Sequence, residues 1–317
     1  MPRDPFAQPL FQPTASRIGL LLFVALVLVI VVERKPPSRW RGSVLFQKVG
    51  SWAVMAPIFA LSVFTGGFVS LGLVVYMSIQ AIIEYGKLVK LARPYLAWLI
   101  GYGVFGLIVT AYFGHRFFLF MPIGFFAVAT LIPLTRLKDP HADPRTEVMQ
   151  AAASVLGYIW IAVFLSFFVL IARTEKQGVA LLLLLGTSVA LSDVLAFTVG
   201  KIAKGPKIRP SVSPNKTWAG AAGNVVGAYL AFWLMSFAIP GDLTKVTVAV
   251  VPLVIGLGAL WGDMVESLVK RAFDTKDAGD LLPGFGGLLD RIDSLLVAMP
   301  LGYYAIKVIQ HYSATPY

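Results

Sequence analysis

The segment VTVAVVPLVIGLGALWGDMVESLVKRAFDTKDAGDLLPGFGGLLDRIDSLLVAMPLGYYAIKVI, residues 246–309, decides the fold because two apolar runs enclose a charged centre. The runs, residues 246–261 and 295–309, have the composition of the interior of membrane helices. The centre, residues 262–294, holds seven of the chain's 16 acidic residues. Ionisable groups at the end of a membrane span are energetically costly, so this concentration of acids predicts a functional site.

The acids are spaced for helices at both ends of this centre. Asp263, Glu266 and Lys270 occupy positions i, i+3 and i+7, which lie on one face of a helix. Asp290 and Asp293 repeat the i, i+3 spacing where the next apolar run begins. The sequence therefore predicts two helix ends, each with carboxylates on a single face.

The loop between these helix ends is rich in glycine. Residues 282–287 are Leu-Pro-Gly-Phe-Gly-Gly, which no regular helix tolerates. Carboxylates beside a flexible backbone suit Mg²⁺ and phosphate groups, because hard cations prefer oxygen ligands. Structural alternatives stay open, since a plain i, i+4 ion pair would also explain Glu266 and Lys270. The dipole at a helix N-terminus would also explain Asp290 and Asp293.

Composition sets the class of protein. Hydrophobic residues make up 57% of the chain and charged residues 14%, and the mean hydropathy is +0.78, which is typical of a polytopic membrane protein. Cysteine is absent, which excludes disulfides and thiolate metal sites, and the three histidines are too scattered to form a metal site. The net charge of +11 indicates loops beside anionic lipid rather than a nucleic-acid partner.

We predict an all-α, polytopic integral membrane protein with nine to ten, most simply ten, transmembrane helices. Pro-, Gly- or charge-rich segments separate the apolar runs, and we find no internal repeat. The predicted spans are residues 18–32, 44–65, 68–84, 95–113, 117–134, 148–172, 178–200, 218–239, 247–269 and 292–309.

The distribution of Lys and Arg predicts the orientation of these spans. Of the 27 Lys and Arg residues, 20 fall in the odd-numbered loops and four in the even-numbered loops. The positive-inside rule then places the odd loops in the cytoplasm and both termini outside. The acidic centre is the ninth loop and residues 200–217 are the seventh, so we expect both to face the cytoplasm.

The seventh loop has the chemistry of a phosphate-binding segment. Its five cations alternate with proline, glycine and hydroxyl residues, and Lys and Arg supply point charges and planar forks for phosphate oxygens. Thr217 is placed to cap the next helix, whose N-terminal amides would face an anion. A topogenic basic loop beside anionic lipid is the structural alternative. The cations are Lys201, Lys204, Lys207, Arg209 and Lys216.

Three segments together resemble the phosphatidate cytidylyltransferases (CDP-diacylglycerol synthases). The longest is Ser267-x2-Lys-Arg-x4-Lys-Asp-x5-Pro-Gly-x-Gly-Gly-x2-Asp-Arg-x-Asp293, which is similar to the family signature. Residues 211–220, Ser-x-Ser-Pro-Asn-Lys-Thr-Trp-x-Gly, and 192–201, Ser-Asp-x2-Ala-Phe-x2-Gly-Lys, resemble two further family segments. One position departs from the pattern, because Phe285 stands where the family usually has His.

The resemblance covers about the C-terminal third and implies a reaction. CTP and phosphatidate would give CDP-diacylglycerol and pyrophosphate, in phospholipid biosynthesis, mostly by positioning and electrostatic neutralisation. The resemblance implies a Mg²⁺ cofactor paired with K⁺, and a homodimer. We expect a multi-pass protein of the bacterial inner membrane. Residues 148–317 would be the catalytic region, and residues 1–147 would be transmembrane helices without a motif.

The resemblance also assigns roles to individual residues. Asp263 and Asp290 are the first choice of metal ligands, with Asp193 and Asp293 as further ligands or supporting residues, and Asp263, Asp290, Lys270 and Arg271 form the catalytic set. Close approach of a ligand to the backbone is expected at the paired glycines of the loop. The expected substrate-binding residues are Lys201, Lys204, Lys207, Ser213, Lys216, Thr217, Gly286, Gly287 and Arg291.

Other functions stay open at this point. A cytidylyltransferase for another lipid phosphate, or a CTP-dependent lipid kinase, would also need carboxylates, basic loops and Mg²⁺. The kinase would release CDP instead of pyrophosphate. A transporter or channel would use Asp193, Asp263 and Glu266 to line an ion path, although the acids cluster at one mouth of the predicted bundle.

Overall fold

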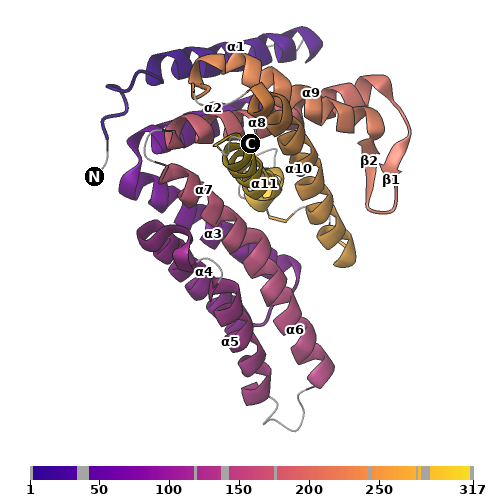
Figure 1. Ribbon diagram of the computed structural model, residues 1–317. Helices are drawn as coiled ribbons and strands as arrows, with labels where there is room; N and C mark the ends of the chain where they lie inside the picture. Colours follow the sequence, from indigo (N-terminus) through magenta and orange to yellow (C-terminus); the bar gives the residue numbers. More distant parts are fainter. Residues whose placement is uncertain are drawn as a thin grey trace.

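The chain folds into a helical bundle with one short β-hairpin (Figure 1). The computed structural model describes residues 3–33, 43–117, 120–136, 143–174, 177–241, 245–275, 278–279 and 286–314. The N-terminal elements are α1 (Phe11–Glu33), α2 (Val44–Thr65), α3 (Gly67–Leu88), α4 (Arg93–Phe113), the 3₁₀ turn η2 (Gly114–Phe117) and α5 (Phe120–Arg136).

The C-terminal half carries the remaining elements. A π-helical turn joins two α-helices into one continuous helix over Pro144–Ala172. The elements are α6 (Pro144–Gly157), η3 (Tyr158–Val163), α7 (Phe164–Ala172), α8 (Gly178–Ala203), β1 (Lys207–Arg209), β2 (Ser213–Thr217), α9 (Trp218–Leu234), η4 (Ser236–Ala238), α10 (Lys245–Ala272) and α11 (Leu289–Ala314).

Every apolar segment predicted to span the membrane contains a helix. Within the described part of the chain, eight helices are long and apolar enough to cross a bilayer. The other two, α5 and α9, have 17 residues each, at the short end of what a span requires. α5 begins at Phe120 rather than residue 117, because Gly114–Phe117 forms a 3₁₀ turn. The protein is therefore a polytopic membrane protein.

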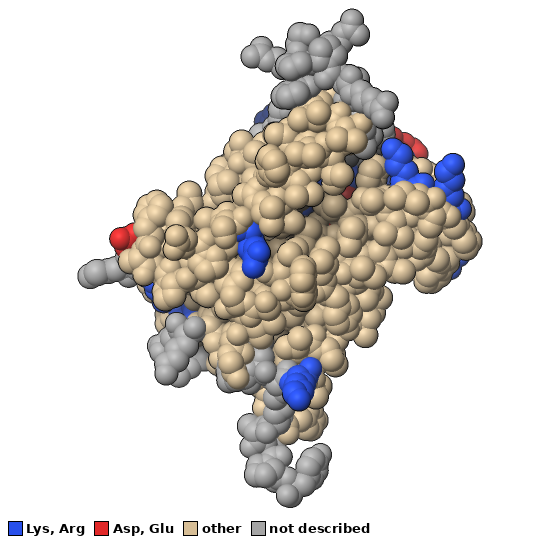
Figure 2. Space-filling view, turned by 90° about the horizontal axis from the view of Figure 1, so that it is seen from above, with Lys and Arg blue, Asp and Glu red and all other residues tan. Residues whose placement is uncertain are grey.

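The surface of the bundle has the chemistry of a lipid-facing surface. Phe23, Phe68, Ile123 and Trp233 are each more than 60% exposed, although they are large and apolar. Figure 2 shows one face of the molecule on which uncharged residues far outnumber Lys, Arg, Asp and Glu. Exposed apolar area on this scale would be unstable in water, so it indicates contact with hydrocarbon.

Close helix packing in the C-terminal half depends on small residues. A Cβ on Gly223 of α9 would lie 2.7 Å from the carbonyl oxygen of Leu195 in α8. A Cβ on Gly256 of α10 would lie 2.7 Å from the Cα of Val225 in α9. Glycine at these two positions therefore allows α8, α9 and α10 to pack backbone against backbone, as small residues do in membrane helices.

Side-chain contacts show that successive helices run in opposite directions. The Tyr95 hydroxyl, at the start of α4, donates to the Glu147 carboxylate at the start of α6, over 2.8 Å. Arg136, at the end of α5, pairs with Glu147 over 3.0 Å. At the other end of α4, the Arg173 guanidinium at the end of α7 donates to the carbonyl of Ala111. Each loop therefore lies at the opposite end of the bundle from the loop before it in this region.

The segment predicted as a basic loop contains the β-hairpin. β1 and β2 pair antiparallel, with Lys207 opposite Thr217 and Arg209 opposite Ser213. The prolines at positions 206, 210 and 214 exclude a helix here because proline lacks the N–H and fixes φ. The amide of Trp218 donates to the carbonyl of Pro206 over 3.1 Å. This bond brings the start of α9 next to the residue that precedes β1.

Candidate metal and phosphate site

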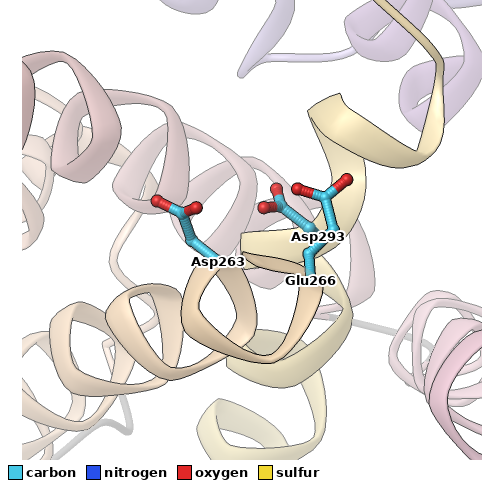
Figure 3. A group of neighbouring side chains, drawn as sticks. All are labelled: Asp263, Glu266 and Asp293. Atoms are coloured by element: carbon cyan, nitrogen blue, oxygen red, sulfur yellow. The ribbon is translucent and has the colours of Figure 1, made fainter. Parts of the chain in front are cut away.

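Three carboxylates from two helices meet at one end of the bundle. Asp263 and Glu266 lie on α10 and Asp293 lies on α11, and one oxygen of each falls within 4.8 Å of the others. Figure 3 shows the carboxylates of Glu266 and Asp293 side by side, with that of Asp263 on the same side of α10. The i, i+3 spacing places the first two on one helical face, and packing of α11 against α10 adds the third.

These carboxylates are largely removed from water. Glu266 is 2% exposed and Asp293 is 4% exposed, whereas Asp263 lies nearer the surface. One oxygen of Glu266 accepts from the Lys270 ammonium over 2.8 Å, and the other is buried without a hydrogen-bond partner. A buried carboxylate oxygen without a partner is unfavourable, so this atom points to a cationic ligand.

Two more carboxylates border this cluster. The Ser294 hydroxyl donates to Asp193 of α8 over 3.1 Å, and Asp193 interacts electrostatically with Asp293 and Asp263. Asp290 pairs with Lys270 over 2.5 Å. Five carboxylates thus lie near two lysines, Lys270 and Lys216, with Asp263 on the side nearest the surface. The excess of negative charge favours a divalent cation there.

The β-hairpin brings one basic residue to the cluster. Lys216, on β2, forms an ion pair with Asp263. The Nε of Arg271, on α10, donates to the carbonyl of Val212 over 3.4 Å, which is a second contact between the hairpin and the acidic helix. The Thr217 hydroxyl accepts from the amide of Gly220 over 3.0 Å and caps α9, as the sequence predicted. The seventh and ninth loops of the sequence analysis therefore meet in space.

The other predicted phosphate-binding residues lie farther out on the same segment. Lys201, Lys204 and Lys207 are exposed, with the Lys201 ammonium 5.7 Å from the ring centre of Phe197. Ser213 is half-buried at the start of β2. Of the lysines predicted to contact phosphate, Lys216 is the one that the structure joins to the acidic cluster.

Asp290 holds the glycine-rich loop rather than joining the three-carboxylate group. Its carboxylate accepts from the amide of Gly287 over 2.6 Å and from the amide of Ala278 over 3.2 Å. Gly286 has φ +83°, and a Cβ there would lie 2.6 Å from the Asp290 carboxylate. Arg291 is half-buried in the first turn of α11. Asp277, Gly284 and Phe285 lie outside the described residues.

A residue that the sequence analysis did not select, Glu84 at the end of α3, anchors the same loop. Its carboxylate accepts from the amide of Leu288 over 3.0 Å and from the amide of Leu289 over 2.7 Å. Gln80 donates to the same carboxylate over 2.8 Å, and Glu84 is 3% exposed. Glu84 therefore caps the N-terminus of α11, the helix that carries Asp293.

A signal for Glu84 is present in the sequence. It is a single acid at the end of an apolar segment, and such a residue in a membrane helix is expected to have a partner. Its partners are backbone amides more than 200 positions away, which no local pattern indicates. Glu266 was recognised in the sequence as an ion-pair residue. The structure places it both in that ion pair and among the three clustered carboxylates.

Comparisons with known proteins agree with the chemistry of this site. Residues 46–309 match the family described as the cytidylyltransferase family. The chain is 31% identical over 303 residues to the uncharacterized protein YnbB of Escherichia coli, a match that covers 90% of this chain and 96% of that protein.

Two shorter matches are to proteins with a named activity. The phosphatidate cytidylyltransferase of Bacillus subtilis is 31% identical over 189 residues, which cover 59% of this chain and 68% of that protein. The phosphatidate cytidylyltransferase of Mycobacterium leprae is 39% identical over 159 residues, which cover 50% of each chain. The matches with a named substrate are thus shorter than the match to YnbB.

Proposed function

Because the chain belongs to the cytidylyltransferase family, we propose that it transfers a cytidylyl group from CTP to phosphatidate, giving CDP-diacylglycerol and pyrophosphate. The observation that carries this proposal is the group Asp263, Glu266 and Asp293, of which the last two are buried, beside Lys216 of the hairpin. Carboxylates for a metal and an ammonium group for phosphate are what nucleotidyl transfer between two anions requires. A polytopic membrane protein is also suited to a substrate that resides in the bilayer.

The carboxylate group fits a hard divalent cation. Its donors are all oxygens, and Mg²⁺ and Ca²⁺ prefer oxygen ligands over nitrogen or sulfur. The unpartnered, buried oxygen of Glu266 supplies a further reason for a cation at this position. Bound Mg²⁺, with K⁺ as a second possible ion, would neutralise triphosphate charge and orient the α-phosphorus. Asp263, Glu266 and Asp293 would hold it, with Asp193 and Asp290 around them.

The chain's own residues supply positioning and charge. Lys216 lies where the hairpin meets the acidic helix, so its ammonium can contact a phosphate group bound between them. Lys270 is held between Glu266 and Asp290 and fixes the orientation of both carboxylates. The phosphate of phosphatidate is already an anion and needs little deprotonation. The proposed reaction therefore depends on bringing the anions together rather than on a general base.

We propose that this site faces the cytoplasm, where CTP is available. The support is the excess of Lys and Arg in the loops that share its end of the bundle, such as residues 200–217. The opposite end carries few such residues in the sequence. A cysteine placed in the hairpin should react with a membrane-impermeant thiol reagent only after the cells are opened, because the reagent cannot otherwise reach the cytoplasm. The wild-type chain has no cysteine, so labelling reports the introduced residue alone.

The test is product analysis with the full-length protein in mixed micelles that contain phosphatidate, CTP and Mg²⁺. We expect release of pyrophosphate and a CDP-lipid, and loss of both in Asp293→Asn. Asp274→Asn is the matched control, because Asp274 is exposed on the loop after α10 and its positive φ of 54° suits asparagine.

Other products would separate the remaining functions. CDP with a newly phosphorylated lipid would assign a lipid kinase. Pyrophosphate release with a polyprenyl phosphate, and none with phosphatidate, would keep the family chemistry and change the acceptor. Ion flux without CTP, together with no turnover on any lipid phosphate, would contradict the proposal and support a transport function.

A further inference from the structure

A cavity of about 530 Å³ lies where the end of α4, the turn η2, the end of α7 and the second half of α11 meet. Its polar lining includes His115, Arg173, Thr174 and Lys307, and its aromatic lining includes Tyr112 and Tyr303. No acidic residue among those described lines it. The cavity therefore has the charge of an anion-binding site, unlike the carboxylate cluster.

This cavity lies at the opposite end of the bundle from the carboxylate cluster. Asp293 and Lys307 are both on α11, and the 14 positions between them correspond to about 21 Å along a helix that rises 1.5 Å per residue. The contact between Arg173 and Ala111 places the ends of α7 and α4 together there. The two sites are thus separated by most of the thickness of a membrane.

The cationic side chains are already positioned by the protein. Arg173 donates to the Ala111 carbonyl, and its Nε would lie 3.7 Å from a Cβ built on Gly114, so its guanidinium lies against the turn. The Lys307 ammonium lies 6.0 Å from the ring centre of Tyr303, within range of a cation–π contact. A guanidinium and an ammonium that converge on one cavity can share the oxygens of a phosphate group.

Aromatic residues at the rim indicate that the ligand is a lipid. Tyr112 is 66% exposed at the end of α4, beside the cavity, and Phe113 is 54% exposed. Tyrosine and other aromatic residues concentrate at the level of lipid headgroups, with apolar helix surface extending from them toward the bilayer centre. Because Tyr112 and Phe113 line the cavity, a headgroup bound in it would leave its acyl chains along the helices.

We propose that this cavity binds the phosphate of an anionic phospholipid in the leaflet opposite the carboxylate cluster. Arg173 and Lys307 bind the phosphodiester, and Thr174 and the Tyr112 ring border the headgroup. The ligand differs from the proposed substrate in both position and role, because it is bound rather than converted. This inference does not rest on the proposed reaction, and its test does not measure turnover.

The test is lipid binding to the full-length protein in detergent, measured by native mass spectrometry as dioleoyl phosphatidylglycerol is titrated. Lys307→Gln is the main variant, because the Lys307 ammonium contacts the face of the Tyr303 ring, a contact that the fold does not depend on. We expect about tenfold weaker phosphatidylglycerol binding in Lys307→Gln and a further loss of affinity in the Arg173→Gln, Lys307→Gln double variant. Lys245→Gln is the matched control, since this exposed lysine begins α10 at the same end of the bundle and outside the cavity lining.

Four outcomes would overturn the inference. Equal phosphatidylglycerol affinity in the wild type and Lys307→Gln would show that the cavity is not the site. The same loss in Lys245→Gln would show that only the charge of that membrane face matters. Equal competition by inorganic phosphate at the same concentration would exclude a lipid as the preferred ligand. Binding of dioleoyl phosphatidylcholine as tight as that of phosphatidylglycerol would exclude recognition of the anionic charge.

Discussion

Replacement of Glu84 by Gln tests whether α3 holds the glycine-rich loop in place. The carboxylate of Glu84 accepts from two successive backbone amides, Leu288 and Leu289, at the start of α11. Glutamine keeps one acceptor oxygen and turns a donor toward the other amide. The variant therefore loses one hydrogen bond to a charged acceptor, and the negative charge at a helix N-terminus disappears.

The expected magnitude follows from these two losses. A hydrogen bond to a charged group contributes about 1.5–3 kcal/mol, and a charge at a buried helix terminus contributes up to about 2 kcal/mol. A local cost of about 2 kcal/mol, at the lower end of the sum of these losses, changes the ratio of ordered to displaced loop roughly 30-fold. We expect kcat/KM for CTP to fall by up to about 30-fold and the Mg²⁺ concentration for half-maximal rate to rise, because α11 carries Asp293.

The assay is pyrophosphate release over a Mg²⁺ titration, with thermal unfolding of the same samples. Glu147→Gln is the matched control, because Glu147 is also a buried glutamate near a helix end and its partners are Arg136 and Tyr95. It should lose thermal stability while its Mg²⁺ dependence stays that of the wild type. Wild-type kinetics in Glu84→Gln, or the same change in Mg²⁺ dependence in both variants, would refute the positioning role.

Three further changes probe other parts of the account. Gly223→Ala should destabilise the protein, because the new Cβ would lie 2.7 Å from a backbone carbonyl oxygen, whereas Gly72→Ala, with open space around it, should raise the unfolding temperature slightly. Thr217→Val removes the cap of α9 and should cost about 1 kcal/mol of unfolding free energy, measured by denaturant titration. Lys216→Met should lower kcat/KM about tenfold or more, and Arg209→Met, on the same hairpin, should leave it within about twofold.

The spans were predictable from the sequence because the bilayer imposes length and composition on each helix. Apolar runs located every helix, including α5 and α9. Helix bounds were less predictable, since α5 begins after a 3₁₀ turn that hydrophobicity does not reveal. The hairpin was predicted only as a loop, although three prolines in residues 206–214 excluded a helix. Pairing of β1 with β2 depends on a contact that closes the hairpin, in which the amide of Trp218 at the start of α9 donates to the carbonyl of Pro206.

The candidate site was predictable where one helix carries its members. Asp263 and Glu266 share a face of α10 by spacing alone, and Asp290 and Asp293 do so on α11. Which of the four carboxylates meet depends on how closely the two helices pack, and a Cβ on Gly262 would collide with the carbonyl oxygen of Asp293. That geometry brings Asp293 to Glu266, while Asp290 contacts Lys270 and the loop amides.

Contacts over long sequence separation were not predictable from local patterns. Glu84 and Leu289 are 205 positions apart, and no spacing rule connects them. Within residues 201–217, composition could not distinguish Lys216 from the other lysines. The fold makes the distinction, because the single lysine of β2, Lys216, reaches Asp263 on α10.

The most direct test of the central claim is the fate of the α-phosphorus of CTP. CTP labelled at that atom is incubated with the protein, Mg²⁺ and phosphatidate, and the lipid fraction is extracted. We predict label in a lipid product for the wild type and Asp274→Asn, and its loss in Asp293→Asn. Label that stays in water-soluble CDP, or lipid labelling that survives in Asp293→Asn, would contradict metal-assisted cytidylyl transfer at the Asp263, Glu266 and Asp293 site.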